Sequence, residues 1–217
     1  MTRLLLVTGA YALCTAAQAQ QAININGELL AAARRGNTEM VQSLLEQGAA
    51  INSRNRLGDT VLLIAAKNGP RAMATLALER GADVNQRNLA GISPLMAAAF
   101  NGDVELTRAL LDHGADVTPA DRVRKTAAVY AAGNGHTEVL RLLLDRGVAV
   151  NQRYDNDLTA LMWAAAYGHD DTVRLLLARG ADPTLRDNRG KSAADMAAET
   201  GHPRTAEELR NYRPAKT

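Results

Sequence analysis

Cysteine is almost absent from this sequence, because the one residue, Cys14, lies in the first segment of the chain. If that segment is removed on export, the mature protein contains no cysteine. A disulfide bond, a thiolate nucleophile and a cysteine-liganded metal site are then all excluded. A lipoprotein signal is disfavoured, since the large Leu13 stands directly before Cys14 where such signals have a small residue.

Aromatic residues and an excess of one charge are also lacking. Aromatics make up 3% of the residues, and the formal net charge is +2. A balanced charge lacks the basic stripe that nucleic-acid binding needs, so we expect no nucleic-acid partner. The hydrophobic fraction is nevertheless 47%. Alanine and leucine supply most of it, and both residues favour helix.

A long apolar run is missing as well. Residues 4–16 are uncharged and mostly apolar, but a bilayer span takes roughly 20 residues. The small residues Ala17 and Ala19 follow in the spacing that signal peptidase needs. This pattern predicts a secretory signal at 1–19, cleaved after Ala19, and no stable membrane insertion afterwards. An ordinary N-terminal helix is the alternative interpretation.

Internal repetition organises the rest of the chain. Three series of residues recur at steps of 33: Gly48, Gly81, Gly114, Gly147 and Gly180; Gly36, Gly69, Gly102, Gly135, Gly168 and Gly201; and Thr60, Ser93, Thr126, Thr159 and Ser192. A period of this length indicates one supersecondary unit per repeat.

One period, which begins at Ser93, shows the chemistry of the unit. Ser93 is a helix N-cap, and Pro94 suits the first helical position because its missing N–H costs nothing there. The pattern predicts a short, alanine-rich helix over 95–100 and a second, leucine-rich helix over 104–112. Gly114 then caps the second helix.

These residues resemble a known family. The segments 59–66, 92–99 and 158–165 look like the Thr-Pro-Leu-His-x-Ala-Ala motif of ankyrin repeats. Segments 135–147 and 81–85 resemble the remainder of the same repeat. Together with the predicted signal, the chain resembles an exported bacterial ankyrin-repeat protein. The resemblance is specific for fold and nearly silent about function.

The fold that this resemblance implies is an all-α ankyrin-repeat solenoid of about six stacked helix-turn-helix units with short β-hairpin-like turns. The expected organisation is a signal peptide at 1–19, a short leader at 20–25, a repeat domain at 26–212 with repeats of about 26–52, 53–85, 86–118, 119–151, 152–184 and 185–212, and a tail at 213–217. The polar last repeat suits a terminal cap.

Two departures from the family pattern carry expectations. The family's histidine after leucine is replaced by Leu63, Met96, Val129, Met162 and Asp195, so apolar packing must substitute for its hydrogen bonds. The family's turn glycine is replaced by Arg124 and Asp157. Because arginine tolerates left-handed backbone poorly, we expect the turn before Thr126 to be distorted.

No convergent catalytic or metal-binding group is recognisable, so we expect no enzyme, no metal and no cofactor. His136, His169 and His202 recur with the repeat. Neighbours in such a stack stand roughly 10 Å apart, too far to share an ion. The family implies a structural role for this position, in joining the two helices of a repeat. An enzyme with an unrecognised site remains an alternative hypothesis.

The family implies partner binding through hairpin tips and first helices, which line its concave face. Five apolar residues stand at the expected hairpin tips, where a polar side chain would cost less free energy: Leu57, Leu89, Ile92, Val123 and Leu158. The predicted partner-binding residues are Arg34, Arg35, Arg56, Leu57, Leu89, Ile92, Phe100, Arg122, Val123, Tyr130, Leu158, Trp163 and Tyr167. Such apolar strips usually mark interfaces, although the tips could instead pack on one another.

The sequence thus predicts a monomeric, periplasmic protein that binds another protein, with inhibition or chaperoning of an exported enzyme as a narrower hypothesis. Basic residues flank the apolar strip and favour an acidic or mixed partner face: Arg34, Arg35, Arg56, Arg122 and Lys125. A structural or membrane-tethered scaffold is the rival hypothesis.

Overall fold

A computed structural model describes residues 24–213 of the chain, which form two compact units divided between Asp83 and Val84. The predicted signal at 1–19, most of the leader at 20–25 and most of the tail at 213–217 lie outside these residues. Unit 1 contains helical residues 24–34, α2 (Thr38–Glu46), α3 (Val61–Asn68) and α4 (Arg71–Glu79).

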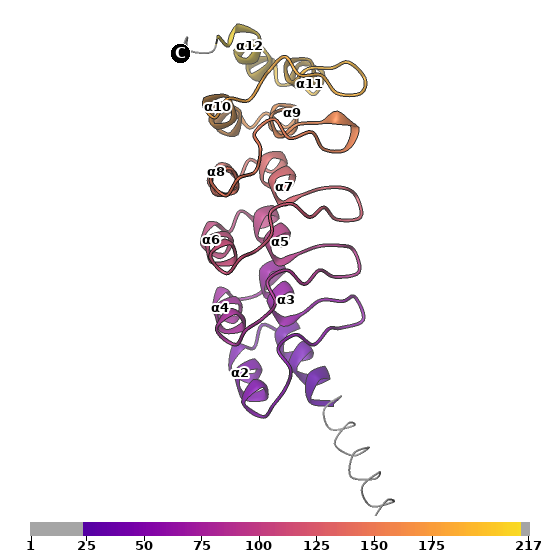
Figure 1. Cartoon of the computed structure of the whole chain (residues 1–217), viewed down its shortest axis with the longest axis vertical. Helices are drawn as coiled ribbons and strands as arrows, with labels where there is room; N and C mark the ends of the chain where they lie inside the picture. Colours follow the sequence, from indigo (N-terminus) through magenta and orange to yellow (C-terminus); the bar gives the residue numbers. More distant parts are fainter. Residues whose placement is uncertain (1–23, 214–217) are drawn as a thin grey trace, which may run out of the picture. The chain divides into compact units, whose positions relative to one another are not determined.

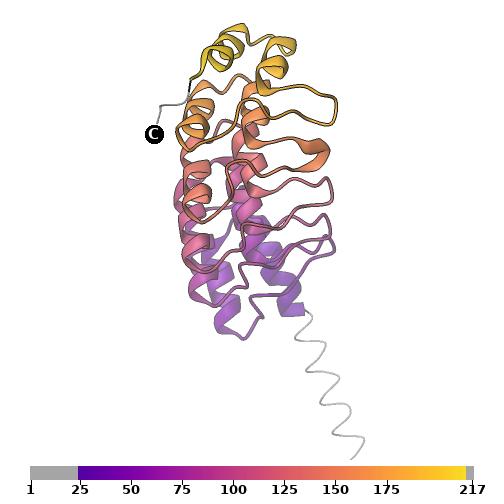
Figure 2. The same cartoon turned by 45° about the horizontal axis from the view of Figure 1, so that its top comes forward.

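Unit 2 repeats one helix pair four times, in two rows (Figure 1). The first helices are α5 (Pro94–Asn101), α7 (Ala127–Gly133), α9 (Ala160–Ala166) and α11 (Ala193–Glu199). The second helices are α6 (Val104–Asp112), α8 (Thr137–Asp145), α10 (Asp170–Ala178) and α12 (Pro203–Asn211). Hairpin-like loops project on the side of the first helices (Figure 2), and no strand occurs within 24–213. The predicted all-α repeat is confirmed.

The predicted N-caps explain where each first helix begins. Ser93, for example, accepts a hydrogen bond at 3.2 Å from the backbone N–H of Met96, and Pro94 occupies the first turn. The side chains of Thr60, Thr126, Thr159 and Ser192 accept the equivalent bond in their repeats. Each cap satisfies an amide that the helix leaves unpaired, which contributes about 1 kcal/mol.

Apolar packing replaces the family's histidine, as predicted. Leu63, Met96, Val129 and Met162 are all buried. Each fully buried side chain of this kind contributes roughly 1.5–3 kcal/mol. Asp195 behaves differently, because its carboxylate accepts the backbone N–H of Ser192 and completes a capping box at the start of α11.

The recurring histidines join consecutive repeats. The Nε2 of His136 donates to the Phe100 carbonyl at 2.9 Å, and that of His169 to the Gly133 carbonyl at 3.0 Å. The His136 ring occupies the space beside Gly102, where a Cβ would lie 2.5 Å from Nδ1. These histidines therefore have a structural role, but the contact differs from the expected one. His136 stands at the start of the second helix α8 and bonds to the first helix of the preceding repeat, whereas the expected role was to join the two helices of one repeat.

Asparagine or aspartate side chains close most of the hairpin turns. In the turn that starts at Asn88, Oδ1 accepts the backbone N–H groups of Ala90 and Ile92. Asn55, Asp121 and Asp187 do the same in their repeats. The side-chain oxygen thus satisfies two backbone N–H groups of the turn and stabilises the reversal of the backbone.

The expectation that the turn before Thr126 is distorted is wrong. Arg124 adopts a φ of 61°, in the left-handed region that Gly91 occupies at 80° in the previous turn. The closing bond from Asp121 N–H to the Lys125 carbonyl stays intact at 3.0 Å. The turn that does change starts at Tyr154, which cannot act as the side-chain acceptor, and there Asn156 and Asp157 both have positive φ.

Candidate binding surface

The hairpin tips of unit 2 are partly linked and partly exposed. The backbone N–H of Arg122 donates to the Ala90 carbonyl at 3.0 Å, so neighbouring tips do contact each other. Leu89 and Val123 nevertheless remain exposed, Val123 to 65%. Ile92 and Leu158 are half-buried, since they stand where each hairpin returns to its first helix.

Four aromatic side chains gather on the first helices of unit 2. The Phe100 and Tyr130 rings meet edge to face with centroids 5.6 Å apart. The Trp163 and Tyr167 rings stack at 6.2 Å. Phe100 and Tyr167 are each 54% exposed, whereas Tyr130 and Trp163 are half-buried. The structure therefore brings together the aromatic residues that the sequence singled out.

These rings border an open recess of about 380 Å³, which we call the aromatic recess. Its lining is Phe100, Lys125, Val129, Tyr130, Gly133, Asn134, Trp163, Tyr167 and His169. Gly133 occupies in α7 the position that Phe100 occupies in α5. A Cβ at Gly133 would stand 3.7 Å from Cε3 of Trp163. The missing side chain thus leaves room between the two pairs of rings.

Lys125 supplies the charge at this recess. Its Nζ lies 4.9 Å from the Trp163 ring centroid and 5.7 Å from that of Tyr130. An ammonium over an aromatic face is attracted by the ring quadrupole. The side chain of Lys125 is therefore held across the rings rather than extended into solvent.

A hydrogen bond orients Tyr130 within the cluster. Its hydroxyl donates to the carboxylate of Asp121, the same residue that closes the adjacent hairpin. Burial, together with this bond and the negative charge of Asp121, raises the pKa of Tyr130 well above its usual range. Tyr130 thus stays a neutral donor, and hairpin and helix are connected through it.

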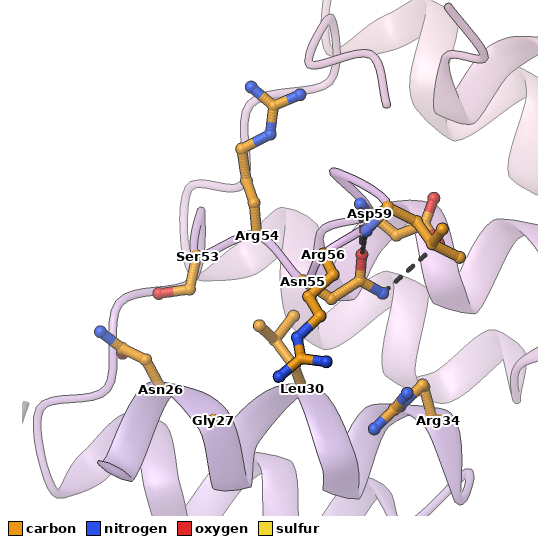
Figure 3. A pocket seen from close by; sticks show the side chains of 10 residues that line it. Asn26, Gly27, Leu30, Arg34, Ser53, Arg54, Asn55, Arg56 and Asp59 are labelled. Carbon is orange, nitrogen blue, oxygen red and sulfur yellow. Dashed lines mark hydrogen bonds between the residues drawn. The ribbon is translucent and has the colours of Figure 1, made fainter. Parts of the chain in front are cut away.

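Unit 1 holds four of the predicted residues, and three of them line a separate recess of about 860 Å³ (Figure 3). Arg34 and Arg56 line it, and Figure 3 shows Arg56 extending toward the helix that carries Leu30 and Arg34. Leu57 also lines the recess and is 64% exposed. The remaining predicted residue of this group, Arg35, is exposed but does not line the recess.

Sequence reasoning left several residues of these surfaces out of the predicted set. Gly133 and His169 line the aromatic recess, and Met40 in α2 is an exposed apolar residue of unit 1. Lys125, which was expected only as a charge flanking the strip, also lines the recess. The one sequence signal for Gly133 was that glycine replaces Phe100 one repeat later. The meaning of that replacement becomes visible only when the neighbouring rings are placed, because the absent side chain then leaves a recess.

Within the described part of the chain, no cluster of histidine, cysteine, aspartate or glutamate is arranged to hold a metal ion. None of the helices in residues 24–213 is both long enough and apolar enough to span a membrane.

Comparison with known families agrees with the repeat geometry. The family described as "Ankyrin repeats (3 copies)" matches residues 4–88, 29–121, 78–154, 95–187 and 150–216. No curated protein matches the chain. Ankyrin repeats are generally protein–protein interaction modules, and the family is typically non-catalytic. Because the matches together cover nearly the whole sequence, the chain belongs to the ankyrin-repeat family.

Proposed function

We propose that this protein is a non-catalytic binding protein that captures a partner protein through the aromatic recess and the hairpin tips of unit 2. The observation that carries the proposal is the exposure of Phe100 and Tyr167, each 54%, in a chain with 3% aromatic residues. Large exposed rings gathered on one surface are typical of interaction sites, where tyrosine and tryptophan dominate binding energy.

The order of the cluster supports the same function. Phe100 packs edge to face on Tyr130, and Tyr167 stacks on Trp163 with an interplanar angle of 9°. Rings that are already fixed lose little conformational entropy when a partner binds. A prearranged surface of this kind favours affinity without a change in fold.

Substitution of the two exposed rings tests the proposal. Full-length protein is used to capture partners from the exported fraction, and the captured protein is identified and titrated. The double variant Phe100→Ala, Tyr167→Ala should weaken capture by roughly tenfold or more, as hot-spot truncation does, with thermal melting within 2–4 °C of wild type. Met40→Ala is the control, because Met40 is an exposed apolar residue of unit 1. Equal capture by wild type and the double variant contradicts the proposal.

We further propose that the protein is bacterial, is exported and acts in the periplasm. The support is the sequence pattern of residues 1–19, in which an apolar run precedes Ala17 and Ala19. N-terminal sequencing of the exported protein tests this, with a start at Gln20 expected. Retention of Met1 would favour the membrane-tethered scaffold instead.

The narrower role that we propose is inhibition or chaperoning of an enzyme in the same compartment. A rigid repeat surface can cover an active site or hold a folding chain without chemistry of its own. Once the partner is captured, its activity and its aggregation are measured with and without this protein. A partner that is unaffected in both measurements contradicts the narrower role but leaves the binding function standing.

A further inference from the structure

In each repeat, one residue lies where the hairpin returns to the first helix, and another lies eight residues later, at the end of that helix. In the first and last complete repeats the side chains at these two positions contact each other. In unit 1, Asp59 pairs with Lys67 at 2.7 Å. In the last repeat of unit 2, Lys191 pairs with Glu199. The intervening pairs are Ile92 with Phe100, Lys125 with Gly133, and Leu158 with Ala166.

The middle pair, Lys125 with Gly133, therefore has the cation of an ion pair but not the carboxylate. Lys125 corresponds to Lys191, but the position of its carboxylate is occupied by Gly133. Among residues 24–213, Lys125 forms no ion pair, and its Nζ rests over the Tyr130 and Trp163 rings. The aromatic recess opens at the place where a side chain of residue 133 would stand.

The other polar groups of the recess already have partners. Asn134 donates to the Phe100 carbonyl at 3.3 Å, and His169 to the Gly133 carbonyl. Tyr130 donates to Asp121, whose other oxygen accepts the backbone N–H of Lys125. The Lys125 ammonium is thus the group left to meet a ligand. It would repel a cation that approached the same rings and attract a carboxylate.

We propose that the aromatic recess receives an aspartate or glutamate side chain of the partner protein. The carboxylate pairs with Lys125 Nζ, at the place where Glu199 stands in the last repeat, and the methylene groups pack against Phe100 and Trp163. The inference rests on the proposed function and adds the chemistry of the partner residue. The apolar tips Leu89 and Val123 lie on hairpins of the same unit, so apolar residues should accompany the acidic one.

A displayed random-peptide library, selected on the full chain, supplies the probe. Enriched peptides should contain a recurrent aspartate or glutamate among apolar residues. Each peptide and its Glu→Gln or Asp→Asn form are then titrated against the fluorescence of Trp163, the only tryptophan in the chain. Loss of the carboxylate should weaken binding by about tenfold or more, since the paired ammonium is then left without its partner.

Variants at matched positions assign the effect to the recess. Lys125→Gln should bind the acidic peptide and its amide form equally, whereas Lys125→Arg should keep the preference for the acid. Lys191→Gln is the matched control, because Lys191 already pairs with Glu199 within the chain, and its peptide affinity should equal that of wild type. Melting curves of all three variants show that the fold is retained.

Two adverse results separate this inference from the proposed function. If the Phe100→Ala, Tyr167→Ala variant loses the peptides but acidic and amide forms bind wild type equally, the carboxylate inference is overturned and the binding surface stands. If the selected peptides bind that double variant as tightly as wild type, or if no peptide is enriched, both are overturned.

Discussion

The ammonium of Lys125 lies 4.9 Å from the centre of the Trp163 ring, although the two residues belong to consecutive repeats of unit 2. Lys125 ends one hairpin, and Trp163 lies in the first helix of the next repeat. A contact of this kind contributes about 0.5–1 kcal/mol at a partly exposed site. It also holds a positive charge at the recess that Gly133 leaves open.

A side chain at residue 133 should complete the ion pair within the chain. Gly133→Gln should raise the unfolding free energy by about 0.5–1 kcal/mol, because glycine weakens a helix. Gly133→Glu should add about 0.3–0.5 kcal/mol by pairing with Lys125. Urea unfolding followed by Trp163 fluorescence measures both. In a Lys125→Gln background the two variants should become equally stable, and a persistent difference would show that Lys125 is not the partner.

Arg124 should be replaceable by glycine with a gain in stability. Its φ of 61° costs a non-glycine residue roughly 1–2 kcal/mol. The exposed ion pair with Asp155, 3.0 Å long, contributes at most about 1 kcal/mol. We expect Arg124→Gly to raise the unfolding free energy by about 0.5 kcal/mol.

The neighbouring Arg122 gives the control for that substitution, because its φ is not positive. Arg122→Gly should lower the unfolding free energy by about 0.5–1 kcal/mol through the greater freedom of the unfolded chain. A loss of stability at both positions would mean that the left-handed turn carries no appreciable strain.

The hairpin turn at Asn88 should depend on its side-chain oxygen. Asn88→Ala removes the acceptor for the backbone N–H groups of Ala90 and Ile92. We expect a loss of about 1–2 kcal/mol in urea unfolding, since Ile92 is half-buried. Asn88→Asp should be nearly neutral, because Asp121 and Asp187 perform the same role. A neutral alanine variant would disprove this account of the turn.

The capping box of α11 should make stability depend on pH in the acid range. Two hydrogen bonds to its carboxylate lower the pKa of Asp195 below the ordinary value of 3.8. The larger effect comes from the backbone N–H of Ser192, and the smaller one from the hydroxyl of the same residue. The ionised carboxylate of Asp195 therefore adds to the unfolding free energy in full above the ordinary value of its pKa. This stabilisation is lost as pH falls through the lowered pKa of the folded state. Asp195→Asn should cost about 0.5–1 kcal/mol at pH 7.

Unfolding curves from pH 7 to pH 2 check the pH dependence. The difference between wild type and Asp195→Asn should shrink over the acid range and disappear below the pKa of the folded state. Glu207→Gln, at an exposed position on α12, is the control and should shift the curve little. A difference that stays constant with pH would mean that the carboxylate charge has no part in the cap.

The sequence alone determined the repeat, its caps and the identity of most surface aromatics. The reason is that these features are local. A serine or threonine such as Ser93 caps the helix that begins next to it, and glycine at fixed intervals ends each helix wherever the unit stands. Phe100 and Tyr167 could be identified as candidate binding residues because large rings are rare in the alanine-rich first helices of the repeats.

Only the tertiary structure decided what those residues form together. The aromatic recess exists because Lys125 reaches Trp163 of the next repeat while Gly133 between them contributes no side chain. Such contacts depend on the register in which consecutive helices stack, and a 33-residue period does not specify that register. The turn at Arg124 is a further example, because its closing hydrogen bonds hold a backbone conformation that the local preference of arginine opposes.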